Sequence, residues 1–319
     1  MIEVNNLCKD YGSQRAIEQV SFTVNKGEVM GLLGVNGAGK TTIMRILTGA
    51  LGATSGSALI AGYDINRQSL AARRQIGYLP EVIPLYLDMT VSHFLNFAAE
   101  IKQVPGNHKK QQVQRSIELC GLEEYQHSLI RKLSQGYRQR LGIAQAIVHQ
   151  PAVIILDEPT RGLDPNQIIK IRSLIQQLSP DHTILLSSHL LAEVEITCQR
   201  LTVIDRGRVI ATDTPANLSK AVGAAEHYEL EFSGDSVVVE NALRHIAAVQ
   251  AVELIPINHP GSGERQLVMV RAIAGQDIGA EIVTALVQQG IQVYMVRRSR
   301  ANLEEVFLAL TKPSHGQII

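Results

Sequence analysis

The sequence predicts an α/β protein of two domains, a large one built on a parallel sheet and a small α+β one after it. Two apolar runs, AVIIL at 152–156 and TILLSS at 183–188, flank a helical pattern, and strand, helix, strand is the order typical of parallel pairing. After residue 220 the order is strand, helix, strand, strand, helix, strand, the split βαβ arrangement of ferredoxin-like domains. The 319 residues also exceed one average domain. We place the domains at 1–218 and 219–319.

The first domain begins with strands and a helix that follows a glycine-rich loop. Apolar and polar residues alternate over residues 1 to about 25, which predicts half-buried strands, and the apolar run at 29–33 predicts a buried one. A helix is expected from Lys40 to Thr48, because Gly49 after it can take the left-handed backbone that ends helices. Turn-rich strands are expected within 51–80.

The rest of the first domain is predicted as an inserted helical region and the remainder of the sheet. The pattern over 91–150 is helical, with a polar break at PGNHKKQQ, residues 105–112. Residues 166–178 form the helix between the two apolar strands. LTVIDRGRVIATD, residues 201–213, predicts a hairpin around its RG pair, because glycine accommodates tight turns.

The second domain is predicted from the same patterns, the alternation typical of strands and the repeat typical of amphipathic helices. A short helix starts at Thr214-Pro215, and VGAAEH at 222–227 is expected to be a linker. The strands and helices of the split βαβ unit are then HYELEF, SVVVENALRHIA, VQAVELIPI, RQLVMVRAI, DIGAEIVTALVQQG and IQVYMVRR. A last helix is expected to carry an apolar face of Leu303, Val306, Phe307 and Leu310.

Composition excludes several classes of protein. The chain is 45% hydrophobic and 19% charged, as globular proteins are. Lysine plus arginine equals aspartate plus glutamate at 30 each, so there is no basic footprint and no nucleic-acid partner is expected. Three cysteines without metal-ligand spacing indicate buried thiols in a reducing compartment. No apolar run approaches the ~18 residues of a membrane span and no signal-peptide pattern is visible, so we expect a cytoplasmic protein.

A glycine-rich loop, GVNGAGKT at 34–41, follows the apolar run at 29–33. It matches the phosphate-binding pattern of glycine, four residues, glycine, lysine and threonine. Glycines let backbone N–H groups approach phosphate oxygens, and the helix after the loop adds its positive dipole end. We expect Lys40 to reach the β- and γ-phosphates of a nucleotide, and the Thr41 hydroxyl to bind Mg²⁺. The alternative is a plain glycine-rich turn.

Two carboxylates end the apolar run AVIIL. Successive side chains leave a strand on opposite sides, so Asp157 and Glu158 face different ways. We expect Asp157 to hold magnesium-bound water, and Glu158 to face the γ-phosphate, where a carboxylate can accept a proton from the attacking water. Pro159 stops the strand. The alternative is a solvated acidic strand end.

The motifs of residues 1 to about 218, taken together, resemble the ATP-binding cassette family, the nucleotide-binding subunits of ABC transporters. They are the glycine-rich loop and the acidic pair, with Tyr11 in KDYGSQRAI, GYLPE, LSQGYRQR, GLDP and SSH, all in the family's order. The resemblance implies a P-loop NTPase cassette with a parallel core sheet, an antiparallel β subdomain and a helical subdomain inserted at about 85–150. Within the family, the chain looks like the cassettes of type-2 exporters, including the gliding-motility type.

The resemblance assigns roles to individual residues. Tyr11 would stack on adenine, and His189 would contact the γ-phosphate and the attacking water. Glu81 stands where many cassettes carry glutamine, in a loop that contacts Mg²⁺, and Asp164 would link two nucleotide sites across a dimer. The ATP-binding loop would be Gly34, Val35, Asn36, Gly37, Ala38, Gly39, Lys40, Thr41 and Thr42. The metal ligands would be Thr41, Glu81 and Asp157, and the catalytic residues Lys40, Glu158 and His189.

Four of these residues have an ordinary structural alternative. Tyr11 is also consistent with a half-buried aromatic at a strand end, and Glu81 with an ordinary loop glutamate. Asp164, just ahead of Pro165, can cap a helix. A lone histidine after a buried strand, such as His189, is usually structural.

The segment LSQGYRQR at 133–140 corresponds to the family's signature, LSGGQ followed by a basic residue. Leu133, Ser134, Gly136 and Arg138 fit this signature, whereas Gln135 and Tyr137 depart from it. In the family this helix start binds the γ-phosphate of ATP held by another subunit, through the serine hydroxyl, the glycine N–H and the helix dipole. Ser134, Gln135 and Tyr137 have no evident partner in their own chain, and Gly136 should tolerate no side chain. The alternative is a simple helix capped by Ser134.

The resemblance implies the ATP-binding and ATP-hydrolysing subunit of an ABC transporter. One phosphate loop and one signature per chain imply head-to-tail pairing with a second cassette, identical or different, around two ATP molecules. This pair would energise a separate integral membrane permease for export, at the inner face of the membrane, with residues 85–130 as the docking surface. Leu85, Tyr86 and Leu87 can instead fill the helical subdomain's own core. The second domain is expected to support pairing or regulation.

Two rival functions share the phosphate loop. A soluble cassette ATPase that acts on ribosomes or nucleic acid usually has two cassettes, coiled coils or zinc insertions, and the sequence shows none of these. A P-loop kinase or GTPase would leave LSQGYRQR and His189 without a role. RNA binding by the second domain would need aromatic residues on its middle strands, and VQAVELIPI and RQLVMVRAI have none.

Overall fold

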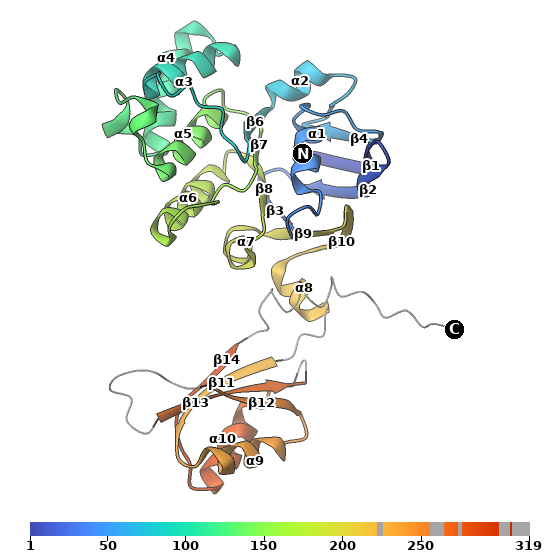
Figure 1. The fold of residues 1–319 in the computed structure, drawn as a ribbon, viewed down its shortest axis with the longest axis vertical. Helices are drawn as coiled ribbons and strands as arrows, with labels where there is room; N and C mark the ends of the chain where they lie inside the picture. Colours follow the sequence, from blue (N-terminus) through green and yellow to red (C-terminus); the bar gives the residue numbers. More distant parts are fainter. Residues whose placement is uncertain (222–225, 256–264, 274–275, 300–306, 308–319) are drawn as a thin grey trace. The chain divides into compact units, whose positions relative to one another are not determined.

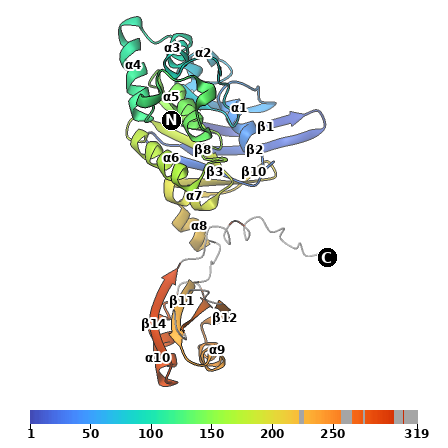
Figure 2. The ribbon, with the colours of Figure 1, turned by 60° about the vertical axis from the view of Figure 1, so that its left-hand side comes forward.

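The chain forms two compact units, residues 1–215 and 216–319, drawn in two views in Figures 1 and 2. The computed structural model describes residues 1–221, 226–255, 265–273, 276–299 and 307. Within these residues, none of the helices combines the length and the apolar character needed to cross a membrane.

A six-stranded sheet forms the centre of the first unit. Its strand order is β10-β9-β3-β8-β7-β6, and all neighbours pair in parallel except the hairpin of β9 and β10. The strands are β3 (Val29–Leu33), β6 (Ile76–Leu79), β7 (Val153–Leu156), β8 (Thr183–Ser188), β9 (Arg200–Asp205) and β10 (Arg208–Asp213). Every residue of β3, β7 and β8 is buried, as expected for strands covered on both faces. The predicted parallel sheet and the predicted hairpin are therefore confirmed.

An antiparallel sheet lies beside the central sheet and shares a hydrophobic core with it (Figure 1). Its order is β2-β1-β4-β5. The strands are β1 (Ile2–Tyr11), β2 (Gln14–Val24), β4 (Ser55–Ile60) and β5 (Tyr63–Asp64), followed by the short helix α2 (Ser69–Arg74). Helix α1 (Lys40–Leu47) contributes Ile43 and Ile46 to the same core, which also contains Val4 and Ile155.

A helical region is inserted between β6 and β7. It consists of α3 (Val91–Ile101), α4 (Gly106–Leu119) and α5 (Gln135–Ile147), with short 3₁₀ turns at 123–125 and 130–132. The predicted polar break at 105–112 is wrong, because α4 begins at Gly106, directly after Pro105. This helix is polar along most of its length and buries only Val113, Ser116 and Ile117, so its apolar stripe is too sparse to be recognised from periodicity.

The chain then returns to the central sheet through two helices. Helix α6 (Pro165–Leu178) agrees with the predicted 166–178 helix, and Asp164 caps it by accepting a hydrogen bond from the Gln167 N–H at 3.0 Å. Helix α7 (Leu191–Thr197) was not predicted from the sequence. The short helix α8 (Pro215–Ala221) begins where the TP pair predicts it.

The second unit is a four-stranded antiparallel sheet with two helices. Its elements are β11 (Glu226–Ser233), α9 (Ser236–Arg244), β12 (Val249–Ile255), β13 (Arg265–Ala272), α10 (Gly279–Gln288) and β14 (Gln292–Ser299). The strand order β12-β13-β11-β14 is that of a split βαβ unit, as predicted. Tyr228, Leu230 and Phe232 alternate along β11 into one core with residues of α9 and α10.

Three expectations at the edges of the second unit have different outcomes. In the predicted linker, 222–225 lie outside the described residues, and Glu226 and His227 already belong to β11. The predicted last helix also lies outside them, apart from Phe307, which is helical and buried. The assignment of 219–319 as an accessory or regulatory domain stays a prediction.

The packing of α5 on β6 gives a test of the fold. A Cβ atom at Gly77 would overlap the Ala146 carbonyl and lie 2.9 Å from Pro151 Cγ, so Gly77→Ala forces a backbone shift. We expect a loss of about 1–3 kcal/mol of unfolding free energy, measured by chemical denaturation. Gly52→Ala is the control, because nothing lies within 4 Å of its Cβ position, and an equal loss there would contradict the packing argument.

Candidate nucleotide site

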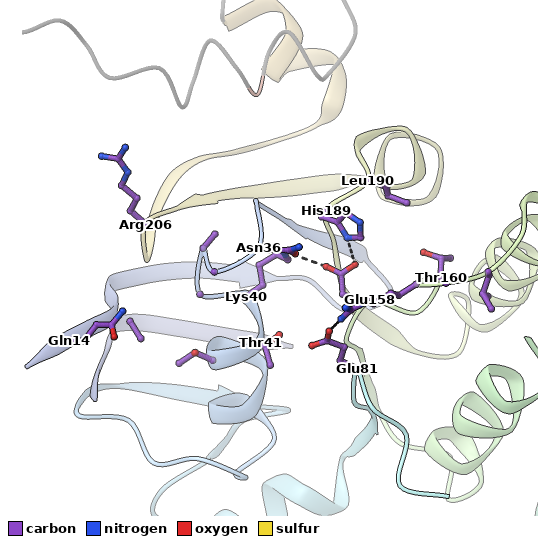
Figure 3. Close-up of a pocket in the computed structure, with 18 of the residues that line it drawn as sticks. Gln14, Asn36, Lys40, Thr41, Glu81, Glu158, Thr160, His189, Leu190 and Arg206 are labelled. Carbon is purple, nitrogen blue, oxygen red and sulfur yellow. Dashed lines mark hydrogen bonds and ion pairs between the residues drawn. The ribbon is translucent and has the colours of Figure 1, made fainter. Parts of the chain in front are cut away.

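A cavity of about 750 Å³ opens at the carboxyl ends of the central strands (Figure 3). Ligands of open parallel sheets bind at this edge, because the loops that follow the strands meet there. Ten of the predicted site residues line the cavity: Asn36, Gly37, Ala38, Gly39, Lys40, Thr41, Thr42, Glu81, Glu158 and His189. Loops that follow β3, β6, β7 and β8 contribute these residues, so one edge of the sheet assembles most of the predicted site.

The glycine-rich loop passes from β3 into α1 with little room for side chains. A Cβ atom at Gly34 would overlap the Ile204 carbonyl, and one at Gly39 would lie 2.7 Å from Ile17 Cγ2. Gly37 and Gly39 also have positive φ angles, 82° and 108°, which favour glycine. The loop is therefore a bare backbone turn at the N-terminus of a helix, the arrangement that binds phosphate.

Lys40 lies folded over the loop it follows. Its Nζ donates hydrogen bonds to the Gly34 carbonyl at 2.6 Å and the Val35 carbonyl at 3.3 Å, and lies 3.5 Å from Oε1 of Glu158. Lysine has three donors and no acceptor, so phosphate oxygens could take the place of all three of these oxygen partners.

Glu158 connects the loop with the end of β8, and Figure 3 shows Lys40, Glu158 and His189 turned toward one another. The Nδ1 atom of His189 lies 2.7 Å from Oε2 of Glu158. An ionised carboxylate only accepts hydrogen bonds, so a contact with the ionised form needs the His189 tautomer that has its proton on Nδ1. The Glu158 backbone has a φ of 50°, uncommon outside glycine, and its N–H donates to the Ser187 hydroxyl at 2.8 Å. This bend turns the carboxylate toward the cavity.

Asp157 points the other way, as the strand alternation predicts. Its Oδ1 accepts hydrogen bonds from the hydroxyls of Ser187 at 2.7 Å and Thr41 at 3.4 Å. Its Oδ2 is buried without a hydrogen-bond partner among the described residues. Burial raises the pKa of Asp157 above its ordinary value of 3.8, although the two hydroxyls oppose the shift. An unpaired carboxylate oxygen beside a threonine hydroxyl fits a hard cation such as Mg²⁺ or its bound water.

Glu81 lies two residues beyond β6 and forms an ion pair with Arg161, which lies in the turn after β7. Both residues line the cavity. Glu81 is therefore within the site, as predicted, but its carboxylate already has a cationic partner in its own chain.

Several predicted residues do not line the cavity. Tyr11 ends β1, is 48% exposed, and pairs across the hairpin with Gln14, which does line the cavity. Asp164 caps α6, which agrees with its structural alternative and leaves a role between subunits untested. The other predicted residues outside the lining are Gly34, Val35, Ser134, Gln135, Gly136 and Asp157.

The start of α5 has more internal contacts than the sequence suggested. The Ser134 hydroxyl accepts a hydrogen bond from the Tyr137 N–H at 3.4 Å, and the Tyr137 ring lies 4.2 Å from the Tyr125 ring. The expectation that Ser134 and Tyr137 lack partners in their own chain is therefore wrong. A Cβ atom at Gly136 would lie 2.5 Å from Cδ of Gln167, so part of the demand for glycine comes from inside the chain.

The chain resembles known transporter subunits along its full length. The family model described as ABC transporter matches residues 17–161. An uncharacterised ABC transporter ATP-binding protein of Bacillus subtilis, YhcH, is 31% identical over 100% of this chain and 98% of its own length. The chain belongs to the ABC transporter family, as an ATP-binding subunit. The bacitracin transport ATP-binding protein BcrA of Bacillus licheniformis is 32% identical, over 97% of both chains.

Solved cassettes show the same fold as this ABC transporter subunit. A structure titled as the ATP-binding subunit of an ABC transporter has a TM-score of 0.64 and 31% identity, and covers 70% of this chain and 93% of its own. The cassette cbiO1 of Clostridium perfringens, part of the transporter complex cbiONQ, has a TM-score of 0.63 and 28% identity, over 68% and 89%. The P-loop cassette fold predicted from the resemblance is confirmed.

Membership in this family decides between the rival functions. The protein is an ATPase that serves transport. The readings as a ribosome- or nucleic-acid-associated cassette and as a P-loop kinase or GTPase are not supported.

Sequence reasoning missed several polar residues around the cavity. Arg15, Arg161 and Arg206 line it, and none was predicted to do so. Arg161 directly follows the DEPT segment, so its place in the first turn after the strand that leads to Asp157 and Glu158 was the available signal. Arg15 lies near the start of β2 and Arg206 in the β9–β10 turn, and no local pattern brings either of them to the loop.

Asp157 gives a test that separates stability from function. Its pKa is raised in the folded protein, so its negative charge costs stability above that pKa, and the cost vanishes as pH falls toward 3.8. Asp157→Asn is therefore expected to increase the unfolding free energy of the nucleotide-free protein at pH 7 by about 0.5–2 kcal/mol, which is measured as a higher Tm. The difference in Tm between Asp157→Asn and the wild type should become smaller when thermal unfolding is measured at lower pH.

The same substitution removes the unpaired oxygen. We expect Mg²⁺-dependent ATP affinity to fall while the Tm rises. A lower Tm at pH 7, with unchanged metal dependence, would contradict this account of Asp157.

Proposed function

We propose that this subunit works by ATP-dependent head-to-tail pairing with a second cassette. One observation carries the proposal: the cavity has the phosphate loop and the Glu158–His189 pair, yet Ser134, Gln135 and Gly136 do not line it. A site that lacks these residues within one chain is completed when the α5 helix start of another chain faces the bound γ-phosphate. The helix N-terminus and the Ser134 hydroxyl supply the added contacts.

The chemistry is water attack on the γ-phosphate. Glu158 would accept the proton of the attacking water, and the contact of its carboxylate with His189 Nδ1 supports this role. Lys40 gives up its contacts with Gly34 and Glu158 to reach the β- and γ-phosphates. Thr41, Asp157 and Glu81 would hold Mg²⁺, which would supply positive charge against the developing charge of the phosphate.

Pairing has a direct test in Glu158→Gln. The substitution keeps the shape of the side chain but removes its basicity, so ATP should bind and persist. We expect light scattering to show a stable dimer with Mg²⁺ and ATP, and ATP turnover to fall by at least about a hundredfold.

The control places a steric block at the helix start. Ser134→Arg in the Glu158→Gln background should bind ATP with unchanged affinity and stay monomeric. A Glu158→Gln chain that stays monomeric at saturating ATP would sink the composite site.

We also propose that residues 85–130, with the loop just before them, dock a membrane permease. Val82, Tyr86 and Leu87 are exposed, Val82 by 83%. Tyr86 rests on the rings of Phe94 and Phe97 at 6.3 and 5.5 Å between centroids, so part of this apolar surface does fill the helical region's own core. The remaining exposed apolar side chains suit a partner of the same character.

Charge placed on this surface tests the docking proposal. Val82→Asp with Leu87→Asp should leave nucleotide affinity unchanged and reduce recovery of a co-expressed multi-span permease by about tenfold or more. Val237→Asp on α9, another exposed apolar position, is the control. Full recovery with the double variant would place the docking surface elsewhere.

Direction and location follow from the same proposal. A linearmycin resistance ATP-binding protein of Bacillus subtilis is 31% identical over 98% of this chain, which supports export over import. The pair of cassettes would then lie at the inner face of the membrane, held by the permease. The second unit would support pairing or regulate it.

A further inference from the structure

Glu81 and Arg161 meet at the cavity, and the water-attack chemistry does not require their pairing. They form an ion pair, with 33% of the Glu81 side chain and 58% of the Arg161 side chain exposed. Neither has a second ion-pair partner within the part of the chain that the structure describes. The pair therefore sits at the border between the cavity and solvent, where either side chain can change partner.

The backbone holds the two residues close together. Strands β6 and β7 pair in parallel, and the Asp157 N–H, directly after β7, donates to the carbonyl of Leu79, the last residue of β6, at 2.8 Å. The Arg161 N–H donates to the Glu158 carbonyl at 3.1 Å, so Arg161 belongs to the same turn as the catalytic carboxylate. Any nucleotide that seats against Glu158 thus approaches both members of the pair.

We propose that Arg161 holds the Glu81 carboxylate while no nucleotide is bound, and releases it to the metal ion that accompanies ATP. This inference rests on the proposed function. A carboxylate oxygen is a ligand that Mg²⁺ prefers, whereas a guanidinium is always charged and has no acceptor. The carboxylate cannot serve both cations fully at once, so Arg161 is a positioning residue that competes with the metal.

The negative charge of Glu81 explains why a positively charged partner, Arg161, is needed at this place. A glutamine in place of Glu81 would be neutral beside the phosphates, but a glutamate without a partner would repel them when the metal is absent. Arg161 cancels this charge in the resting chain. Its loss should weaken metal-free ATP binding about three- to tenfold, the size of a unit-charge interaction at about 4 Å in water, which is the appropriate medium for so exposed a pair.

The experiment measures the dissociation constant of a fluorescent ATP analogue, with Mg²⁺ and with EDTA, on the full chain. The EDTA-to-Mg²⁺ ratio of these constants is the readout, because a merely structural ion pair would not change it. We expect Arg161→Gln to raise the ratio about three- to tenfold, Glu81→Gln to lower it, and Arg161→Lys to stay near the wild type. Arg115→Gln, which breaks the exposed pair with Asp181, is the matched control.

The double variant separates two explanations. In a Glu81→Gln background, Arg161→Gln should change the ratio by a clearly smaller factor, because Arg161 then no longer holds a carboxylate back from the metal. An equal change in both backgrounds would mean that Arg161 binds the nucleotide itself, and no change in either would mean that the pair is only structural; each result overturns the inference. A wild-type chain that fails to bind the analogue at all would instead count against the proposed function.

Discussion

The carboxylate of Glu158 lies between Lys40 from the glycine-rich loop and His189 after β8, and the arrangement of the whole site depends on that position. Three strands of one parallel sheet must end side by side for these groups to meet. The register pairs Leu33 with Ser188 and Leu156 with Leu186, and the strands are buried throughout. Both faces of these strands are packed, so a shift of one residue would exchange the side chains that fit each face, and core packing therefore fixes how Lys40, Glu158 and His189 meet.

The parts of this protein that follow local rules could be predicted from the sequence. The buried strands, the phosphate loop, the opposite directions of Asp157 and Glu158 and the split βαβ order all come from spacing within a few residues. Helix α4 could not, because it buries so narrow a stripe that tertiary packing decides its structure. The contacts of Tyr137 with Tyr125 and of Gly136 with Gln167 join different elements, so no local pattern reports them.

Two of the three departures from the family's motifs come with a partner in the same chain. Glu81, where many cassettes carry glutamine, has Arg161, and Tyr137, which interrupts the signature, has the Tyr125 ring. A buried or half-buried group that changes its chemistry needs a changed neighbour, because an unmatched charge or an unsupported ring costs free energy. The departures therefore alter how the resting chain is held together while the backbone features of the site, the bare loop and the helix start, are kept.

The resting contacts also explain why ATP, and not the chain alone, would close a pair of cassettes. Lys40 contacts a carbonyl of its own loop and the carboxylate of Glu158, and Asp157 has one buried oxygen without a hydrogen-bond partner among the described residues. These resting contacts are compatible with a folded chain, but phosphate would give Lys40 a more negatively charged partner, and a metal ion would give the free Asp157 oxygen a cation to bind. The free energy that favours closure then comes from contacts that exist only with nucleotide present, so it is lost again once the γ-phosphate leaves.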